Sequence, residues 1–331
     1  MLAIQTESLV KSYGGANAVD NVSIGVEEGE IFGFLGTNGA GKSTTMMILT
    51  TLLKPTSGRA RVVGHDVVQS PREVRRNIGY VQQDTAVDEF LTGRDNLMLQ
   101  ARLSHLPSGE RGARIDEILE MIELGARADD ATVTYSGGMR KRLDIAGGLL
   151  HMPRVLFLDE PTVGLDIQTR RKIWEYIRRV HDEYGMTIFL TTHYMEEADS
   201  LCDRVGIIDR GRIRTVDSPS SLKSAMGSEV ITMRVDGDAE ALASAIHALP
   251  GIREMSRDGG EITVYTYSGT SLIPRIFRES DGAGARISSI SLKQPTLDDV
   301  FISYTGHELR DDEDTAYDRK KAYRKTRELR A

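Results

Sequence analysis

Residues 36–43 read Gly36-Thr37-Asn38-Gly39-Ala40-Gly41-Lys42-Ser43, and this octapeptide decides the fold of the chain. It fits the pattern G-x-x-x-x-G-K-[ST] at every position. The apolar run Ile31–Leu35 precedes it, and the residues from Thr44 to Leu49 have the pattern of a helix. A strand, a glycine-rich turn and a helix in this order cradle phosphate, because the turn points several backbone N–H groups at one anion and the helix adds its positive end. The sequence therefore predicts a nucleotide site in an α/β fold.

The residues of this loop predict how a nucleotide would be held. Lys42 is expected to reach the β- and γ-phosphates, and Ser43 to ligate Mg²⁺ through its hydroxyl. Thr44 is expected to donate to the α-phosphate. The predicted phosphate-binding set comprises Gly36, Thr37, Asn38, Gly39, Ala40, Gly41, Lys42, Ser43 and Thr44.

An acidic pair closes a second apolar run further along the chain. Val155–Leu158 predicts a buried strand, and Asp159 and Glu160 follow it directly. A carboxylate at a strand end suits Asp159 to hold Mg²⁺. Glu160 is then placed to act as a general base on the attacking water. The alternative is a solvated acidic pair at the end of a strand, but two acids behind four apolar residues are costly unless a cation or a reaction uses them.

Three further segments complete an ordered set of motifs. They are Gln82-Gln83, then Tyr135-Ser136-Gly137-Gly138-Met139 before a helix that begins near Arg140, and then His193 after a predicted strand. Small residues at a helix N-terminus form an anion site. Together with the glycine loop and the acidic pair, these segments resemble the ATP-binding subunit of an ABC transporter, over roughly residues 1–220. The resemblance implies a P-loop NTPase with a RecA-like core and a helical subdomain, and ATP and Mg²⁺ as cofactors.

The resemblance also implies roles for these residues. Ser136, Gly137 and Gly138 would bind the γ-phosphate of ATP held by a second subunit, so that two chains, most simply two copies of this one, face each other. Gln83 is preferred to Gln82 as the ligand of Mg²⁺ and water, because the family often reads I-G-Y-V-P-Q where this chain has Ile78–Gln83. His193 would contact the γ-phosphate.

Two further residues, one aromatic and one acidic, are assigned to this set from their positions in the sequence. Tyr13 is placed to stack on adenine, and the alternative is an ordinary core tyrosine. Asp166, in Gly164-Leu165-Asp166, matches the loop that communicates across the dimer of the family. A structural histidine is the corresponding alternative for His193. Tyr135 and Met139 stand where the family more often has Leu and Gln, and the serine and glycines between them are kept.

Sequence periodicity divides the chain into further parts. Leucines and isoleucines recur at helical spacing over about 88–150, which predicts a mostly helical insert within an ATPase domain of residues 1–217. Residues 218–306 read strand, helix, strand, strand, helix, strand, the order of a ferredoxin-like α+β domain. From 307 to 331 an acidic block precedes a basic one, which predicts poor order. Pro295-Thr296-Leu297-Asp298-Asp299-Val300-Phe301 resembles the C-terminal ending of drug exporters of the daunorubicin-resistance type.

Bulk composition limits the possible functions. Of the 331 residues 27% are charged, and a net charge of −7 argues against nucleic acid as a partner. The single cysteine, Cys202, excludes an intramolecular disulfide. No stretch reaches the roughly 20 apolar residues that span a bilayer, and no secretory signal is seen. Transport would therefore need a multi-span membrane permease from another polypeptide, with this chain peripheral at the cytoplasmic face of the membrane.

The sequence thus predicts the ATP-hydrolysing subunit of an ABC exporter for a drug-like, lipid or other hydrophobic compound. Two alternatives remain. One is an ABC-type ATPase without a transport role, and the other is a nucleotide-gated regulatory module that hydrolyses slowly, if at all. The first usually carries two ATPase units in one chain, a long coiled-coil insertion or zinc-binding cysteines. The intact Asp159-Glu160 pair and His193 argue against the second.

Overall fold

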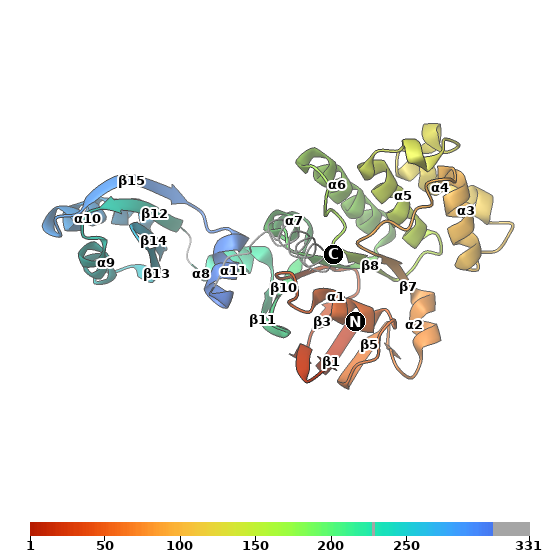
Figure 1. The fold of residues 1–331 in the computed structure, drawn as a ribbon, viewed down its shortest axis with the longest axis horizontal. Helices are drawn as coiled ribbons and strands as arrows, with labels where there is room; N and C mark the ends of the chain where they lie inside the picture. Colours follow the sequence, from red (N-terminus) through yellow and green to blue (C-terminus); the bar gives the residue numbers. More distant parts are fainter. Residues whose placement is uncertain (227–228, 307–331) are drawn as a thin grey trace, which may run out of the picture. The chain divides into compact units, whose positions relative to one another are not determined.

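The computed structural model describes residues 1–226 and 229–306. The chain divides between Val216 and Asp217 into two compact units, whose elements are labelled in Figure 1. The charged segment predicted at 307–331 lies outside the described residues.

A six-stranded sheet forms the centre of the first unit, in the order β11-β10-β4-β9-β8-β7. Its strands are β4 (Ile31–Leu35), β7 (Ile78–Val81), β8 (Val155–Asp159), β9 (Thr187–Thr192), β10 (Arg204–Asp209) and β11 (Arg212–Asp217). The strands from β10 to β7 pair in parallel. Every residue of β4, β8 and β9 is buried, which explains why these segments read as continuous apolar runs. Parallel strands bring their carboxyl ends to one edge, where the predicted site residues follow.

A second, antiparallel sheet packs over the first, with the helix that follows the glycine loop between them. It contains β1 (Leu2–Tyr13), β2 (Ala16–Val22), β3 (Gly25–Glu27), β5 (Ser57–Val62) and β6 (His65–Asp66). Helix α1 (Lys42–Leu49) contacts β2 and β5 as well as β8 and β9. One apolar cluster fills the space, and Ile4, Val62, Met46, Phe157 and Phe189 all belong to it. The two sheets can be followed in Figure 1.

Helices form the rest of the first unit. They are α2 (Pro71–Asn77), α3 (Gly93–Leu103), α4 (Arg111–Met121), α5 (Gly137–Leu149), α6 (Ile167–Tyr184) and α7 (Met195–Leu201), with short 3₁₀ turns at Gly125–Arg127 and Thr132–Thr134. Helices α3, α4 and α5 pack on one another through Leu97, Ile115, Ile118 and Leu143, which are fully buried. The predicted combination of a RecA-like core and a helical subdomain is confirmed. Residues 104–110 separate α3 from α4.

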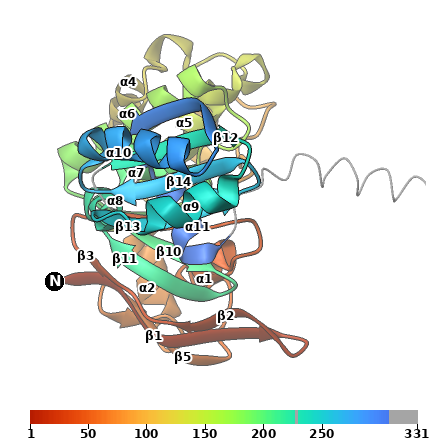
Figure 2. The same ribbon diagram turned by 90° about the vertical axis from the view of Figure 1, so that its left-hand side faces the viewer.

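The second unit is a four-stranded antiparallel sheet with helices against it. Its elements are α8 (Pro219–Met226), β12 (Glu229–Asp236), α9 (Ala239–His247), β13 (Ile252–Asp258), β14 (Glu261–Thr266), α10 (Gly269–Gly282), β15 (Arg286–Lys293) and α11 (Leu297–Thr305). The strand order β13-β14-β12-β15 is that of a ferredoxin-like sheet. Helices α9 and α10 contact the sheet, as Figure 2 shows. Ile231, Val264, Leu242 and Ile276 belong to the core between sheet and helices.

The segment 295–301 begins the last helix of this unit. Thr296 and Asp299 form a capping box, in which Thr296 Oγ1 accepts from Asp299 N and Asp299 Oδ2 accepts from Thr296 N. Val300 and Phe301 are fully buried, and α11 packs on α8. The sequence pattern of this segment therefore has a structural cause, a capped helix that closes the unit. Among the helices that the structure describes, none has the length and apolar character of a membrane span.

Candidate functional site: a phosphate loop and an acidic strand end

Two glycines of the 36–43 loop occupy positions that no larger residue fits. Gly41 has a φ of 106°, and a Cβ there would lie 2.3 Å from the carbonyl oxygen of Ala18. A Cβ on Gly36 would lie 2.4 Å from the carbonyl oxygen of Ile208. The loop is therefore folded tightly against β10 and β2. Gly41 also has no side chain to cap the first amides of α1, so the positive end of that helix is left for an anion.

Lys42 lies inside this loop and joins it to the acidic strand end. Its Nζ donates to the carbonyl oxygens of Gly36 at 2.8 Å and Thr37 at 3.1 Å, and it lies 3.1 Å from Glu160 Oε1. The residue is 4% exposed. Burial lowers the pKa of the Lys42 ammonium, and the attraction of Glu160 opposes this shift.

Ser43 and Asp159 bring two oxygen donors together at the start of α1. Ser43 Oγ donates to Asp159 Oδ1 at 3.2 Å. The hydroxyl of Thr191 donates to the same carboxylate and accepts from Glu160 N at 3.0 Å. Thr191 is a site residue that the sequence reasoning missed, although a Thr-Thr pair at the end of a buried strand was a visible signal. A hydroxyl and a carboxylate are the hard oxygen ligands that Mg²⁺ takes alongside phosphate and water, so these residues fit that ion.

Glu160 follows β8 in a backbone conformation that non-glycine residues seldom adopt. Its φ is 46°, and its amide is held by Thr191, through the carbonyl oxygen at 3.2 Å and Oγ1. Such strain persists where the surroundings enforce it, and it collects at functional sites. This turn points the carboxylate at Lys42 and at His193, whose Nδ1 lies 3.3 Å from Glu160 Oε2. Burial raises the pKa of Glu160, but His193 and Lys42 outweigh it and leave the pKa below its usual value.

Gln82 and Gln83 emerge at the same edge of the sheet. In the pairing of β7 with β8, Val81 lies beside Leu158, so Gln83 follows the carboxyl end of β7 next to Asp159, the last residue of β8. Both glutamines are exposed. Their carbonyl oxygens accept from Lys141 Nζ, at 2.8 Å for Gln82 and 3.2 Å for Gln83. The preference for Gln83 stays a prediction.

The Ser136-Gly137-Gly138 segment forms the N-terminus of α5. Ser136 caps the helix, with its Oγ accepting from Met139 N at 3.2 Å, and Ser136 and Gly137 are exposed. Gly138 is buried, and a Cβ there would lie 2.4 Å from Thr169 Cγ2. Thr169 in turn donates to Asp166, the N-cap of α6. The segment and the Asp166 loop therefore pack together as an exposed helix start. Among the described residues, the side chains of Lys42 and Glu160 contact Gly36, Thr37, each other and His193, and this segment is not one of their partners.

Tyr135 is buried and its hydroxyl donates to the carbonyl oxygen of Arg127. Gly93 leaves the space for that hydroxyl, because a Cβ on Gly93 would lie 2.5 Å from it. The tyrosine, which departs from the leucine more often found in the family, is therefore accommodated by Gly93 on α3.

Tyr13, at the end of β1, is 50% exposed. Lys11 Nζ lies 5.2 Å from the centre of its ring. This exposure argues against the alternative of a core tyrosine. The ring is free to stack on a planar ligand on one side, and its role toward adenine stays a prediction.

Two families match this chain in succession. Residues 19–163 match the family described as "ABC transporter", and residues 218–305 match "ATP-binding protein DrrA1-3-like, C-terminal domain". The daunorubicin/doxorubicin resistance ATP-binding protein DrrA of Streptomyces peucetius is 42% identical over 315 residues, which cover 92% of this chain and 93% of that protein. The linearmycin resistance ATP-binding protein LnrL of Bacillus subtilis is 35% identical, over 93% of this chain and 100% of that protein.

Solved structures agree with the sequence matches. A dimeric ATP-binding cassette in a post-hydrolysis state with ADP and Pi has a TM-score of 0.59 and 28% identity, over 65% of this chain and 98% of that chain. A subunit of an ABC transporter complex from Clostridium perfringens has a TM-score of 0.63 and 28% identity, over 75% of this chain and 96% of that chain.

The chain belongs to the ATP-binding subunits of ABC transporters. It is an ATP-binding P-loop ATPase whose C-terminal unit is of the DrrA type. The predicted recognition, fold class and ATPase activity are thereby confirmed.

Proposed function

We propose that this chain hydrolyses Mg-ATP to energise export of a drug-like or other hydrophobic compound through a separate membrane subunit. The observation that carries the proposal is the contact of Lys42 and His193 with the two oxygens of Glu160, beside the Ser43–Asp159 pair. These residues come from three separate segments of the chain, and the fold brings them to one edge of the sheet.

Each residue of the site then has a chemical task. Glu160 takes a proton from the attacking water, a task that its lowered pKa and ionised state permit. Lys42 and the backbone amides of residues 36–44 hold and neutralise the phosphates. His193 contacts the γ-phosphate from the other side of Glu160. Tyr13 stacks on adenine.

Ser43, Asp159 and Gln83 would hold Mg²⁺, which, when bound, neutralises charge on the β- and γ-phosphates. Gln83 would also orient the attacking water from the end of β7. The hydroxyl of Thr191 keeps the carboxylate of Asp159 facing Ser43. The proposed magnesium site thus depends on a residue that supports the ligands as well as on the ligands themselves.

The second half of each site comes from a second copy of the chain. Ser136 and Gly137 are exposed at the start of α5, and the first backbone amides of a helix, which have no partner within the helix, suit a γ-phosphate held by that copy. ATP would then bridge two chains. Binding closes the dimer and hydrolysis opens it, and this alternation drives the membrane subunit.

The membrane partner and the direction of transport are inferred from the relatives. Their names refer to resistance to daunorubicin, doxorubicin and linearmycin, and another relative, from Sinorhizobium fredii, is a Nod factor export ATP-binding protein with 37% identity over 94% of this chain and 88% of that protein. We place this chain at the cytoplasmic face of the membrane, bound to a multi-span permease. An ATPase without a transport role is the second candidate, and the relatives disfavour it.

Purification of the full chain from detergent-solubilised membranes tests the export proposal. The expected result is co-purification of a multi-span membrane protein, and stimulation of ATP hydrolysis by hydrophobic compounds when the pair is reconstituted in vesicles. A Lys42→Met variant is the control, since it should retain the partner and lose the stimulated hydrolysis. Recovery with ribosomes or DNA in place of a membrane protein would overturn the proposal.

A further inference from the structure

Lys141, on helix α5, binds the loop that follows β7. Its Nζ donates to the carbonyl oxygens of both Gln82 and Gln83, at 2.8 and 3.2 Å. The side chain is 5% exposed. Lys141 therefore fixes the backbone at the entrance of the loop, next to the residue proposed to bind Mg²⁺ and water.

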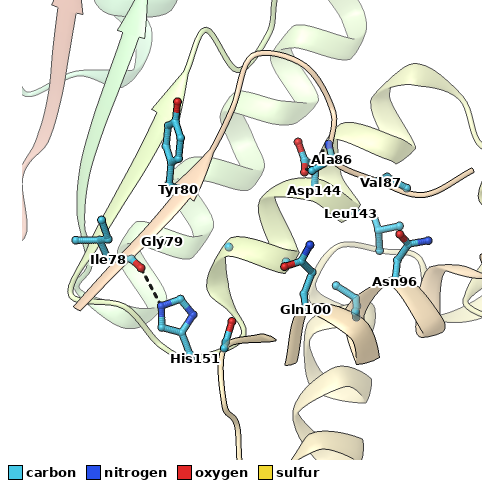
Figure 3. Close-up of a pocket in the computed structure, with 14 residues that line it drawn as sticks. Ile78, Gly79, Tyr80, Ala86, Val87, Asn96, Gln100, Leu143, Asp144 and His151 are labelled. Atoms are coloured by element: carbon cyan, nitrogen blue, oxygen red, sulfur yellow. Dashed lines mark hydrogen bonds between the residues drawn. The ribbon is translucent and has the colours of Figure 1, made fainter. Parts of the chain in front are cut away.

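Asp144 lies one turn further along α5 and holds the other end of the same loop. Its Oδ1 accepts from Ala86 N at 3.3 Å, and its Oδ2 lies 3.7 Å from Lys141 Nζ. Figure 3 shows the Asp144 carboxyl beside Ala86, at the rim of a pocket that Tyr80 and Gln100 also line. The two residues thus hold residues 82–86 at both ends.

The burial of this ion pair argues that it has a specific task. Lys141 and Asp144 are 5% and 9% exposed. Burial lowers the pKa of Lys141 and raises that of Asp144, in each case against the attraction of the partner. Two well-packed apolar side chains of similar volume would stabilise a fold about as well, so such pairs give little net stability. What this pair provides is a fixed loop geometry.

Helix α5 carries a second functional feature at its first turn. Ser136 caps the helix, and Gly137 and Gly138 begin it. Lys141 and Asp144 stand on the following turns of the same 13-residue helix. One rigid element therefore joins the loop of Gln83 to the segment that faces the second copy of the chain.

We propose that Lys141 and Asp144 form a clasp that positions the 82–86 loop on α5. The clasp makes Gln83, at one ATP, and Ser136–Gly138, at the other ATP, move as one body. Lys141 and Asp144 are positioning residues that act through Gln83, and this part of the inference rests on the function proposed above for Gln83. Displacement of the loop at one site would then be transmitted to the other through α5.

Amide hydrogen exchange on the full chain tests the clasp itself. We expect Lys141→Met to raise exchange in the peptide of residues 82–86 by at least about tenfold, because release of the Gln82 and Gln83 carbonyl oxygens loosens the loop whose Ala86 amide is held by Asp144. The pair Lys141→Met with Asp144→Leu, which leaves no unpaired buried charge, should do the same. Arg142→Met is the matched control, because Arg142 stands on the same helix but donates to the carbonyl oxygen of Ile122. Unchanged exchange at 82–86 in both clasp variants would overturn the proposal.

A double-mutant cycle on ATP hydrolysis tests whether the clasp acts through Gln83. We expect Lys141→Met to lower kcat about tenfold, as loss of supporting shells around a metal site does, with KM for ATP little changed. In a Gln83→Ala background it should lower kcat no further. Equal falls in the two backgrounds would show a merely structural role and overturn the inference.

A failure of the role proposed for Gln83 and a failure of the proposed clasp give different results. If Gln83→Ala leaves kcat unchanged, the role proposed for Gln83 is wrong, and the exchange experiment alone then decides whether the clasp exists. If Gln83→Ala lowers kcat but Lys141→Met does not, the clasp is wrong and the role of Gln83 stands.

Discussion

Lys42 Nζ lies 3.1 Å from Glu160 Oε1, and the two side chains are only 4% and 7% exposed. The contact joins the phosphate loop to the end of β8, two segments that are far apart in the sequence. Burial strengthens the attraction between the two charges, and removal of either partner would leave an unpaired charge in the interior, which destabilises the fold. Because Lys42 also donates to Gly36 and Thr37, a phosphate that binds its ammonium must take over part of these contacts.

Lys42→Met should lower the affinity for ATP by at least about tenfold, because a hydrogen-bonded charge on the phosphates is lost. Titration with a fluorescent ATP analogue measures the affinity. Lys172→Met, at an exposed position on α6, is the control and should bind as the unchanged protein does. Equal affinities of the two variants would contradict the role of Lys42.

Glu197→Gln should make the protein less sensitive to rising pH. The carboxyl of Glu197 is buried and accepts from Thr162 and Trp174, and burial raises its pKa. The folded state therefore holds the proton longer than the unfolded state, so stability falls as pH rises from about 4.5 through the raised pKa. The unfolding temperature at pH values between about 5 and 8 measures this fall in stability. Glutamine keeps the oxygen that accepts from Thr162 and Trp174 but does not titrate, so stability should fall less with rising pH. An equal fall in the two proteins would count against Glu197 as its cause.

Gly138→Ala should destabilise the fold, while Gly137→Ala should not. A Cβ at 138 would lie 2.4 Å from Thr169 Cγ2, whereas one at 137 meets only Leu165 Cδ2 at an ordinary 3.5 Å. We expect a loss of about 1–3 kcal/mol in the free energy of unfolding for Gly138→Ala and a change within about 0.5 kcal/mol for Gly137→Ala. Urea denaturation of both variants measures this, and similar losses would refute the packing argument.

Gly93→Ala should be rescued by Tyr135→Phe. The added methyl group would lie 2.5 Å from the Tyr135 hydroxyl, and phenylalanine removes that oxygen. Tyr135→Phe alone should cost about 1 kcal/mol, since its hydrogen bond to Arg127 is lost. The combined variant should be more stable than the sum of the two losses predicts, and simple additivity of unfolding free energies would show that the two residues do not share this space.

Much of the site could be predicted because its residues directly follow buried strands. The apolar runs before residues 36 and 159 predicted strands that end in the phosphate loop and in the acidic pair, and a parallel sheet collects the carboxyl ends of its strands at one edge. His193 was assigned by its resemblance to the family. The ferredoxin-like order of the second unit followed from the alternation of strand and helix patterns in the same way.

Other features depend on contacts that no local pattern encodes. Thr191 reads as one more strand residue until β8 and β9 are paired, when its hydroxyl meets Asp159. In the sequence Lys141 and Asp144 look like the polar face of an exposed helix, and their burial becomes visible only when α5 is packed in the fold, with the 82–86 loop against it. The space beside Gly93 is likewise visible only with Tyr135 in place.

Glu160→Gln tests the central claim most directly, that the cluster of Lys42, Glu160 and His193 hydrolyses ATP. Phosphate release and nucleotide binding are measured on the same preparation, with Glu196→Gln, an exposed acid on α7, as the matched control. The account predicts that Glu160→Gln still binds ATP, accumulates a closed dimer and loses at least about 100-fold in turnover, while Glu196→Gln keeps its activity. Hydrolysis by Glu160→Gln at the unchanged rate would contradict it.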